Sequence, residues 1–183
     1  ERKGVRIVTF QDELYPELLK QIPDFPPVLY VIGELKARFS LPIAVVGTRK
    51  ITSYGKTATR LITKELVQSG AQIISGFMYG VDAFAHESAL DFGGYTLGVL
   101  GYGFDYSYPD SAKHLELRKR ILESGGGFIS EYHPDTEPNP GLFPERNRIV
   151  AGLSKGVLVT EAAAKSGSKI TASLATEYGR DVF

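Results

Sequence analysis

Short apolar runs alternate with amphipathic segments along most of this chain. Residues 43–46 form a β-branched run of buried-strand length, which breaks at Gly47 into a polar turn. Ser53 then predicts a helix N-cap, and apolar residues recur at helical spacing until Gly70 ends the segment. The stretch predicts a strand, a glycine turn and a helix, and the backbone N–H groups at such a helix start favour an anion.

The same alternation continues on both sides of this stretch. Apolar runs predict further strands at residues 5–10, 28–32, 72–76, 95–101, 127–132, 156–161 and from 181 onward. Helical spacing predicts helices at residues 12–22, 80–92, 111–124, 145–154 and 167–178. Repeated strand–helix units predict a doubly wound, mainly parallel α/β sheet of extended Rossmann-like type.

The pattern also predicts how the chain is divided. Residues 1–40 are interrupted by prolines at 23, 26 and 27, and we expect them to form a small N-terminal extension packed on the core of residues 41–183. Because the last three residues begin another strand directly after a helix, we expect the core to be truncated at its C-terminus.

Composition narrows the function classes. The chain contains no cysteine, which excludes a disulfide framework and cysteine-ligated metal and suits a cytoplasmic protein. No apolar run approaches the ~18 residues of a membrane span, so we expect no membrane partner. The net charge is zero, so a nucleic-acid partner would have to be recognised by a local patch. The segment from Lys36 to Lys64 holds seven basic residues and no acidic one, although we interpret Lys56, Arg60 and Lys64 as the solvated face of a helix.

Candidate ligand-binding turns follow several strands. In doubly wound sheets ligands bind at the carboxyl ends of the strands, where the turns at residues 47–49, 75–76, 101–103 and 161–162 should converge. Arg49 lies in the first turn, and we interpret it as a ligand contact. Residues 166–168 could cradle a phosphate at a helix start or simply cap that helix. Neither a full dinucleotide fingerprint nor a Walker lysine motif is present.

Other polar residues allow two interpretations each. Asp82 and His86 lie one helical turn apart and could form a metal or acid–base pair. We favour a carboxylate that caps backbone N–H groups and a buried, hydrogen-bonded histidine. We expect His114 and His133 at the surface. Glu161 ends an apolar strand and is either catalytic or paired with a basic group such as Arg49 or Arg146.

The segment from Phe143 to Arg148 presents an aromatic ring and then two arginines and an asparagine. Aromatic faces stack on bases and arginines hold phosphates, which is the chemistry of sequence-independent single-strand binding. Alternatively, Phe143 fills the core and one arginine is structural. Because Arg146 and Arg148 point about 200° apart on a helix, we expect one of them to be structural.

Several ordered motifs together resemble the DNA-processing protein A (DprA/Smf) family from about residue 15 to the C-terminus. They are Gly-Thr-Arg at 47–49 with Ser-Tyr-Gly at 53–55, Ser-Gly at 75–76 with Gly-Val-Asp at 80–82, Phe-Pro-Glu-Arg-Asn-Arg at 143–148 and Ser-Gly-Ser at 166–168. The resemblance implies binding of single-stranded DNA, protection of incoming strands in natural transformation, loading of the RecA recombinase and a homodimer. It implies neither catalysis nor a cofactor.

The resemblance also implies roles for individual residues. Arg49, after Gly47, would hold a phosphate, and the backbone around Ser75 and Gly76 would line the same pocket. Phe143 would stack a base. The pocket wall and further basic contacts would come from Arg146, Asn147, Lys169 and Arg180.

One departure from the family pattern and one rival class remain. The family usually has a small residue and a basic one where this chain has Phe77, Met78 and Tyr79, so part of the pocket's charge is missing. Lys169 stands where an aliphatic residue is common, and could restore charge. The rival is a nucleotide-cleaving, phosphoribohydrolase-like enzyme on a related fold with Glu161 as its catalytic carboxylate, although the Pro-Gly-Gly-x-Gly-Thr loop of those enzymes is absent.

Overall fold

A computed structural model describes residues 4–163 and 166–183. Its strands are β1 (Arg6–Thr9), β2 (Val28–Gly33), β3 (Pro42–Gly47), β4 (Gln72–Ser75), β5 (Thr96–Leu100), β6 (Gly127–Ser130), β7 (Gly156–Glu161) and β8 (Asp181–Val182). Its helices are α1 (Ser53–Gln68), α2 (Val81–Asp91), α3 (Ala112–Glu123), α4 (Leu142–Gly152) and α5 (Ser168–Glu177), and a short 3₁₀ turn, η1, covers Leu19–Gln21.

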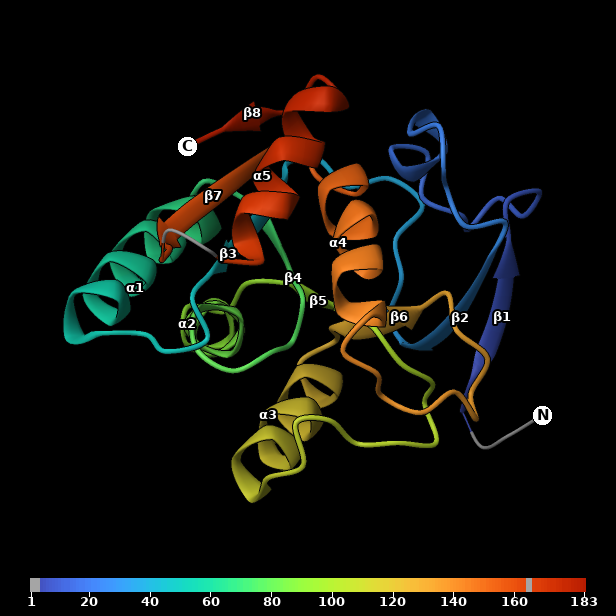
Figure 1. Cartoon of the computed structure of the whole chain (residues 1–183), viewed down its shortest axis with the longest axis horizontal. Coiled ribbons are helices and arrows are strands. Elements are labelled where there is room, and N and C mark those ends of the chain that lie inside the picture. The colour runs from blue at the N-terminus through green and yellow to red at the C-terminus, as the bar shows by residue number, and fades with distance from the viewer. Residues whose placement is uncertain (1–3, 164–165) are drawn as a thin grey trace.

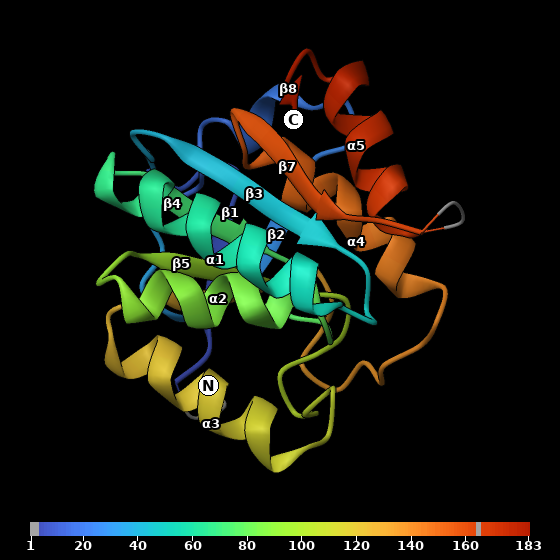
Figure 2. The same cartoon turned by 90° about the vertical axis from the view of Figure 1, so that its left-hand side faces the viewer.

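The described strands form one eight-stranded sheet in the order β1-β2-β6-β5-β4-β3-β7-β8. The pairings from β6 through to β8 are parallel, whereas β1 and β2 join the sheet antiparallel at one edge. The helices α1, α2 and α3 cover one face and α4 and α5 the other (Figures 1 and 2). This arrangement confirms the doubly wound, mainly parallel α/β fold.

The order of the strands creates a reversal at β3. From β3 the chain proceeds outward through β4, β5 and β6, and it then crosses back to place β7 and β8 on the other side of β3. The connections after β3 and β7 therefore diverge at their carboxyl ends. In doubly wound sheets a ligand crevice opens at such a switch point.

Both faces of the central strands are buried. In β3, Ala44 and Val46 belong to the core cluster under α4 and α5, whereas Ile43 and Val45 belong to the cluster under α1 and α2. Successive side chains of a strand point to opposite faces, so an uninterrupted apolar run serves both layers. The alternation explains why this strand is recognisable from the sequence.

Three local predictions were wrong. Residues 12–22 form only the η1 turn instead of a helix, because Pro16 lies in the middle of that segment and disfavours a helical residue before it. Thr52, not Ser53, caps α1, with its side chain accepting from the Gly55 N–H. Helix α4 begins at Leu142 rather than at residue 145, since Pro144 falls in the first turn, where its missing N–H costs nothing.

No helix in the described part of the chain is long and apolar enough to cross a membrane.

Candidate functional site

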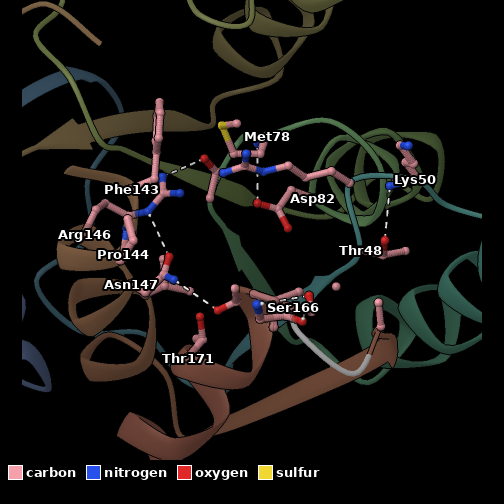
Figure 3. Close-up of a pocket in the computed structure, with 18 residues that line it drawn as sticks. Thr48, Lys50, Met78, Asp82, Phe143, Pro144, Arg146, Asn147, Ser166 and Thr171 are labelled. Carbon is pink, nitrogen blue, oxygen red and sulfur yellow. Dashed lines mark hydrogen bonds between the residues drawn. The ribbon is translucent and has the colours of Figure 1, made fainter. Parts of the chain in front are cut away.

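A cavity of about 380 Å³ lies at the switch point between β3 and β7. Its walls come from the turn after β3, the loop before α2, the first turns of α4 and the start of α5. Figure 3 shows Phe143, Arg146 and Asn147 on one side, Thr48 and Lys50 on the other, and Ser166 and Thr171 on a third. Segments far apart in the sequence thus meet at one edge of the sheet.

The turn after β3 supplies one wall. Its Thr48 N–H donates to the Glu161 carbonyl at 2.7 Å, and the Lys50 N–H donates to Thr48 Oγ1 at 3.2 Å. A Cβ on Gly47 would lie 2.5 Å from Val81 Cγ2, so only glycine lets the turn approach α2 this closely. These contacts fix the backbone from which Arg49 projects.

Arg49 brings an unpaired positive charge to the cavity. The residue is exposed, and its guanidinium carbon lies 5.7 Å from the centroid of the Phe143 ring. Among residues 4–163 and 166–183 it has no ion-pair partner within 4.0 Å. A guanidinium held this way can take an incoming anion without first breaking a salt bridge.

The opposite wall is built around a buried arginine. Arg146 is 3% exposed and donates through Nη1 to the Gly76 carbonyl at 2.6 Å and to the Val99 carbonyl. A Cβ on Gly76 would lie 2.6 Å from both Arg146 Nη2 and Asp82 Oδ2, so glycine is required between the two charges. Arg146 therefore binds the ends of two strands together beneath the cavity.

Asp82 contributes a buried carboxylate to the same wall. Its Oδ2 accepts from the Met78 N–H at 3.4 Å, in the loop before α2, rather than capping an N–H group of the helix itself. Burial raises the pKa of the Asp82 carboxyl, and the charge of Arg146 opposes that shift. Among the described residues, the lining thus holds three cationic side chains, Arg49, Lys50 and Arg146, against one carboxyl group.

The start of α5 closes the cavity. Ser166 Oγ accepts from the Ser168 N–H at 3.3 Å and lies 2.7 Å from Ser168 Oγ, while Asn147 Nδ2 donates to the Gly167 carbonyl at 3.3 Å. The first N–H groups of α5 already donate to Ser166 and Gly167, so this helix start brings the positive end of its dipole to the cavity rather than free N–H groups. Such a helix start favours a phosphate or another anion.

Six of the residues selected from the sequence line this cavity, namely Gly47, Arg49, Gly76, Phe143, Arg146 and Asn147. Ser75 is buried directly behind the lining, where its hydroxyl donates to the Val45 carbonyl at 2.7 Å. Lys169 is exposed on α5 outside the lining. Met78 and Thr171 also line the cavity but were not selected, although Met78 lies only two residues after the Ser-Gly turn.

Arg180 is not brought to the cavity. It follows the C-terminal end of α5, and its Nη2 donates to the Leu18 carbonyl at 3.2 Å and to Gln21 Oε1 at 3.1 Å. Its contacts tie the η1 segment to the end of the chain, which is a structural role at the opposite end of α5.

Phe143 has little accessible ring. It is 6% exposed and stacks on Tyr108 with centroids 5.3 Å apart and an interplanar angle of 26°. This arrangement matches the alternative in which Phe143 fills the core. Stacking of a base on Phe143, as the family resemblance implies, would require the ring to be uncovered first.

Arg148 is the structural arginine of the α4 pair. Its Nη1 and Nη2 each donate to a Glu131 carboxylate oxygen at 2.6 Å, and its Nε lies 3.3 Å from Asp24 Oδ2. The prediction that one of the two arginines would be structural is confirmed, although Arg146 is also almost wholly buried.

The structure confirms some of the remaining predictions for polar residues and contradicts others. His86 is fully buried with Nδ1 2.6 Å from Thr96 Oγ1, and burial lowers its pKa to about 3, which confirms a neutral, hydrogen-bonded histidine. His133 is exposed as expected, but His114 is 5% exposed and the surface prediction for it was wrong. Glu161 accepts from the Thr52 N–H at 2.9 Å, at the start of α1, rather than pairing with an arginine.

Comparison with known proteins identifies the family. The model of the DNA recombination-mediator protein A family matches residues 6–183. This chain belongs to that family. Protein Smf of Synechocystis sp. is 46% identical over all of this chain, which covers 46% of that protein. DNA processing protein DprA of Bacillus subtilis is 39% identical over 99% of this chain and 60% of its own length.

Solved DprA structures agree. DprA from Streptococcus pneumoniae superposes with a TM-score of 0.87 at 38% identity, covering 99% of this chain and 62% of that one. DprA from Helicobacter pylori, solved in a study of its single-stranded DNA binding mode, superposes with a TM-score of 0.85 at 35% identity. The match covers 97% of this chain and 80% of that one. A molybdenum cofactor binding protein from Rippkaea orientalis, at 19% identity and a TM-score of 0.55, shares the fold alone.

The family fixes a broad role. By name, proteins of this family are DNA-processing proteins and recombination mediators. This chain spans about half the length of the curated Smf relatives it matches.

Proposed function

We propose that this chain binds single-stranded DNA in the cavity at the switch point, protects incoming strands in natural transformation and helps to load RecA recombinase onto them. The observation that carries the proposal is that the Arg49 guanidinium, without an ion-pair partner among the described residues, lines the same cavity as the start of α5. The likeness to the Helicobacter pylori DprA, which was studied for its single-stranded DNA binding, supports the same conclusion.

The charges of the lining favour one position for a phosphate. Arg49 and Lys50 attract an anion beside the turn after β3, and the positive end of the α5 dipole favours one near Ser168, whereas the Asp82 carboxyl lies next to Gly76. We therefore propose that the phosphate lies between the turn after β3 and Ser168. A cavity of about 380 Å³ falls in the size range of small-molecule sites and is large enough for a nucleotide unit.

The test is fluorescence anisotropy of a labelled oligo-dT strand titrated with the chain at several salt concentrations. The variant Arg49→Ala should weaken binding and flatten the log–log salt slope by about 0.7, the value for one phosphate contact on a single strand. Arg38→Ala is the matched control, because Arg38 is an exposed arginine just before the amino end of β3. It should leave the slope unchanged.

Two results would contradict the proposal. Equal affinity and slope for the wild type and Arg49→Ala would remove Arg49 from the binding site. Release of free base from a nucleoside monophosphate would instead favour the phosphoribohydrolase-like alternative, for which Glu161 would have to leave its hydrogen bond with Thr52.

The partners are proposed separately from the cavity. We propose a cytoplasmic homodimer that contacts RecA through a surface other than the cavity, as the family resemblance implies. Light scattering after size exclusion measures the dimer, and co-elution with RecA measures the contact. Both should survive Arg49→Ala, and loss of either would mean that the cavity takes part in assembly.

A further inference from the structure

The loop before α2 carries an aromatic side chain, Tyr79, in a different state from Phe143. Tyr79 is 42% exposed, whereas Phe143 is 6% exposed and already stacked on Tyr108. A nucleobase can only stack on a ring that it can reach, so exposure decides between them. Tyr79 directly follows Met78, which lines the cavity.

The backbone holds Tyr79 against the turn that carries Arg49. The next residue, Gly80, has φ +79°, and a Cβ there would lie 2.1 Å from the Thr48 carbonyl oxygen and 2.7 Å from that of Arg49. The Val81 N–H donates to the Thr48 carbonyl at 3.1 Å. The loop before α2 and the turn after β3 are therefore in direct contact, and Tyr79 immediately precedes the residue that makes this contact with the Arg49 backbone.

The ring itself is supported from below. Tyr79 packs nearly perpendicular to His114, with centroids 4.9 Å apart and an interplanar angle of 80°. His114 is buried, and its Nδ1 lies 3.0 Å from Ser111 Oγ, the side chain that caps α3. A ring fixed in this way loses little conformational entropy when a base stacks on it.

We infer that Tyr79 is the base-stacking platform at the mouth of the cavity, for the nucleotide next to the one whose phosphate Arg49 holds. This inference rests on the proposed single-stranded DNA binding. The strand's phosphates meet Arg49 and Lys50 while a base lies on Tyr79, which combines positive charge with an aromatic face as in other sequence-tolerant single-strand sites. Stacking contributes affinity without a phosphate contact.

The test measures the affinity for oligo-dT of variants that remove or keep the aromatic ring at position 79. Tyr79→Leu keeps an apolar side chain against His114 but removes the flat ring, and it should raise the Kd for oligo-dT about 5- to 150-fold. Tyr79→Phe should stay within about twofold, since the ring remains. In both variants the salt slope should equal that of the wild type, because no phosphate contact is lost. Phe10→Leu is the matched control, because Phe10 is also 42% exposed but lies just after β1.

A second measurement reports stacking directly. The chain contains no tryptophan, so Tyr79→Trp introduces a single indole whose fluorescence should be quenched as oligo-dT saturates the site. Phe10→Trp should show no quenching. This readout remains informative if the leucine variant unfolds.

The outcomes separate the two hypotheses. If the wild type binds oligo-dT but Tyr79→Leu has the same Kd, or Tyr79→Trp shows no quenching, Tyr79 is not the platform. The proposed function then still stands. Wild-type protein that is folded but fails to bind oligo-dT at low salt overturns both. A lower affinity for Tyr79→Leu that Tyr79→Phe restores supports the platform.

Discussion

Replacement of Arg146 by methionine tests whether the buried guanidinium holds the cavity wall. Methionine keeps most of the aliphatic volume but donates no hydrogen bond. The variant loses the charge-assisted bonds to the Gly76 and Val99 carbonyls, and it leaves Asp82 without its main opposing cation. Hydrogen bonds to charged groups contribute about 1.5–3 kcal/mol each. The charge of Arg146 also opposes the rise in the pKa of the buried Asp82 carboxyl, so its removal adds to this cost. We therefore expect the free energy of unfolding to fall by about 3–5 kcal/mol.

Urea unfolding followed by circular dichroism measures this change. The exposed Arg38→Met should stay within about 0.5 kcal/mol of the wild type and serves as the matched control. A double-mutant cycle with Asp82→Asn isolates the coupling, since the asparagine carries no charge that needs Arg146. The double variant should be more stable than the sum of the single effects by about 0.5–3 kcal/mol. A loss below about 1 kcal/mol for Arg146→Met, or full additivity, would refute the buried pair.

Two further predictions concern stability. Since burial lowers the pKa of His86 from 6.5 to about 3, the unfolded chain takes up the proton first as pH falls. Stability should therefore drop below pH 6.5 by about 1.4 kcal/mol per unit from this group. Between pH 6.5 and 5, the urea midpoint should fall less in His86→Gln than in the wild type, whereas in the exposed His133→Gln it should fall as much as in the wild type. Equal falls in His86→Gln and the wild type would contradict a buried neutral histidine. Gly80→Ala should be less stable than Gly70→Ala by about 1–3 kcal/mol. Both glycines have positive φ, but only at Gly80 would a Cβ meet the Thr48 carbonyl, so equal losses in thermal unfolding would show that this contact is relaxed.

The succession of strands and helices could be predicted because its signals are local. The β3 run alternates between two buried faces, and Gly70, at φ +82°, marks the end of α1 as expected. The helix predicted at residues 12–22 is absent from the structure, because Pro16 disfavours a helix there despite the helical spacing of the apolar residues. Apolar spacing alone therefore does not determine a helix. Likewise Pro144 was interpreted as a boundary, although a proline fits inside the first turn of α4.

Parallel topology explains why residues far apart in the sequence could be predicted to meet. The carboxyl ends of parallel strands share one sheet edge, so the turn with Arg49, the turn with Gly76 and the α4 segment with Arg146 had to converge. That Arg180 lies elsewhere follows from its position after α5, which returns the chain to the opposite edge of the sheet.

Only the tertiary structure decided how accessible each of these side chains is. The sequence placed Phe143, Tyr79 and Arg146 in or next to candidate binding motifs and His114 at the surface, but whether each is buried depends on segments remote in the chain. Tyr108 covers Phe143, the ends of β4 and β5 enclose Arg146, and the loop before α2 covers His114 while leaving Tyr79 partly exposed. Burial is a property of packing between elements, which no local pattern encodes, and it determines which aromatic ring and which cation a ligand can reach.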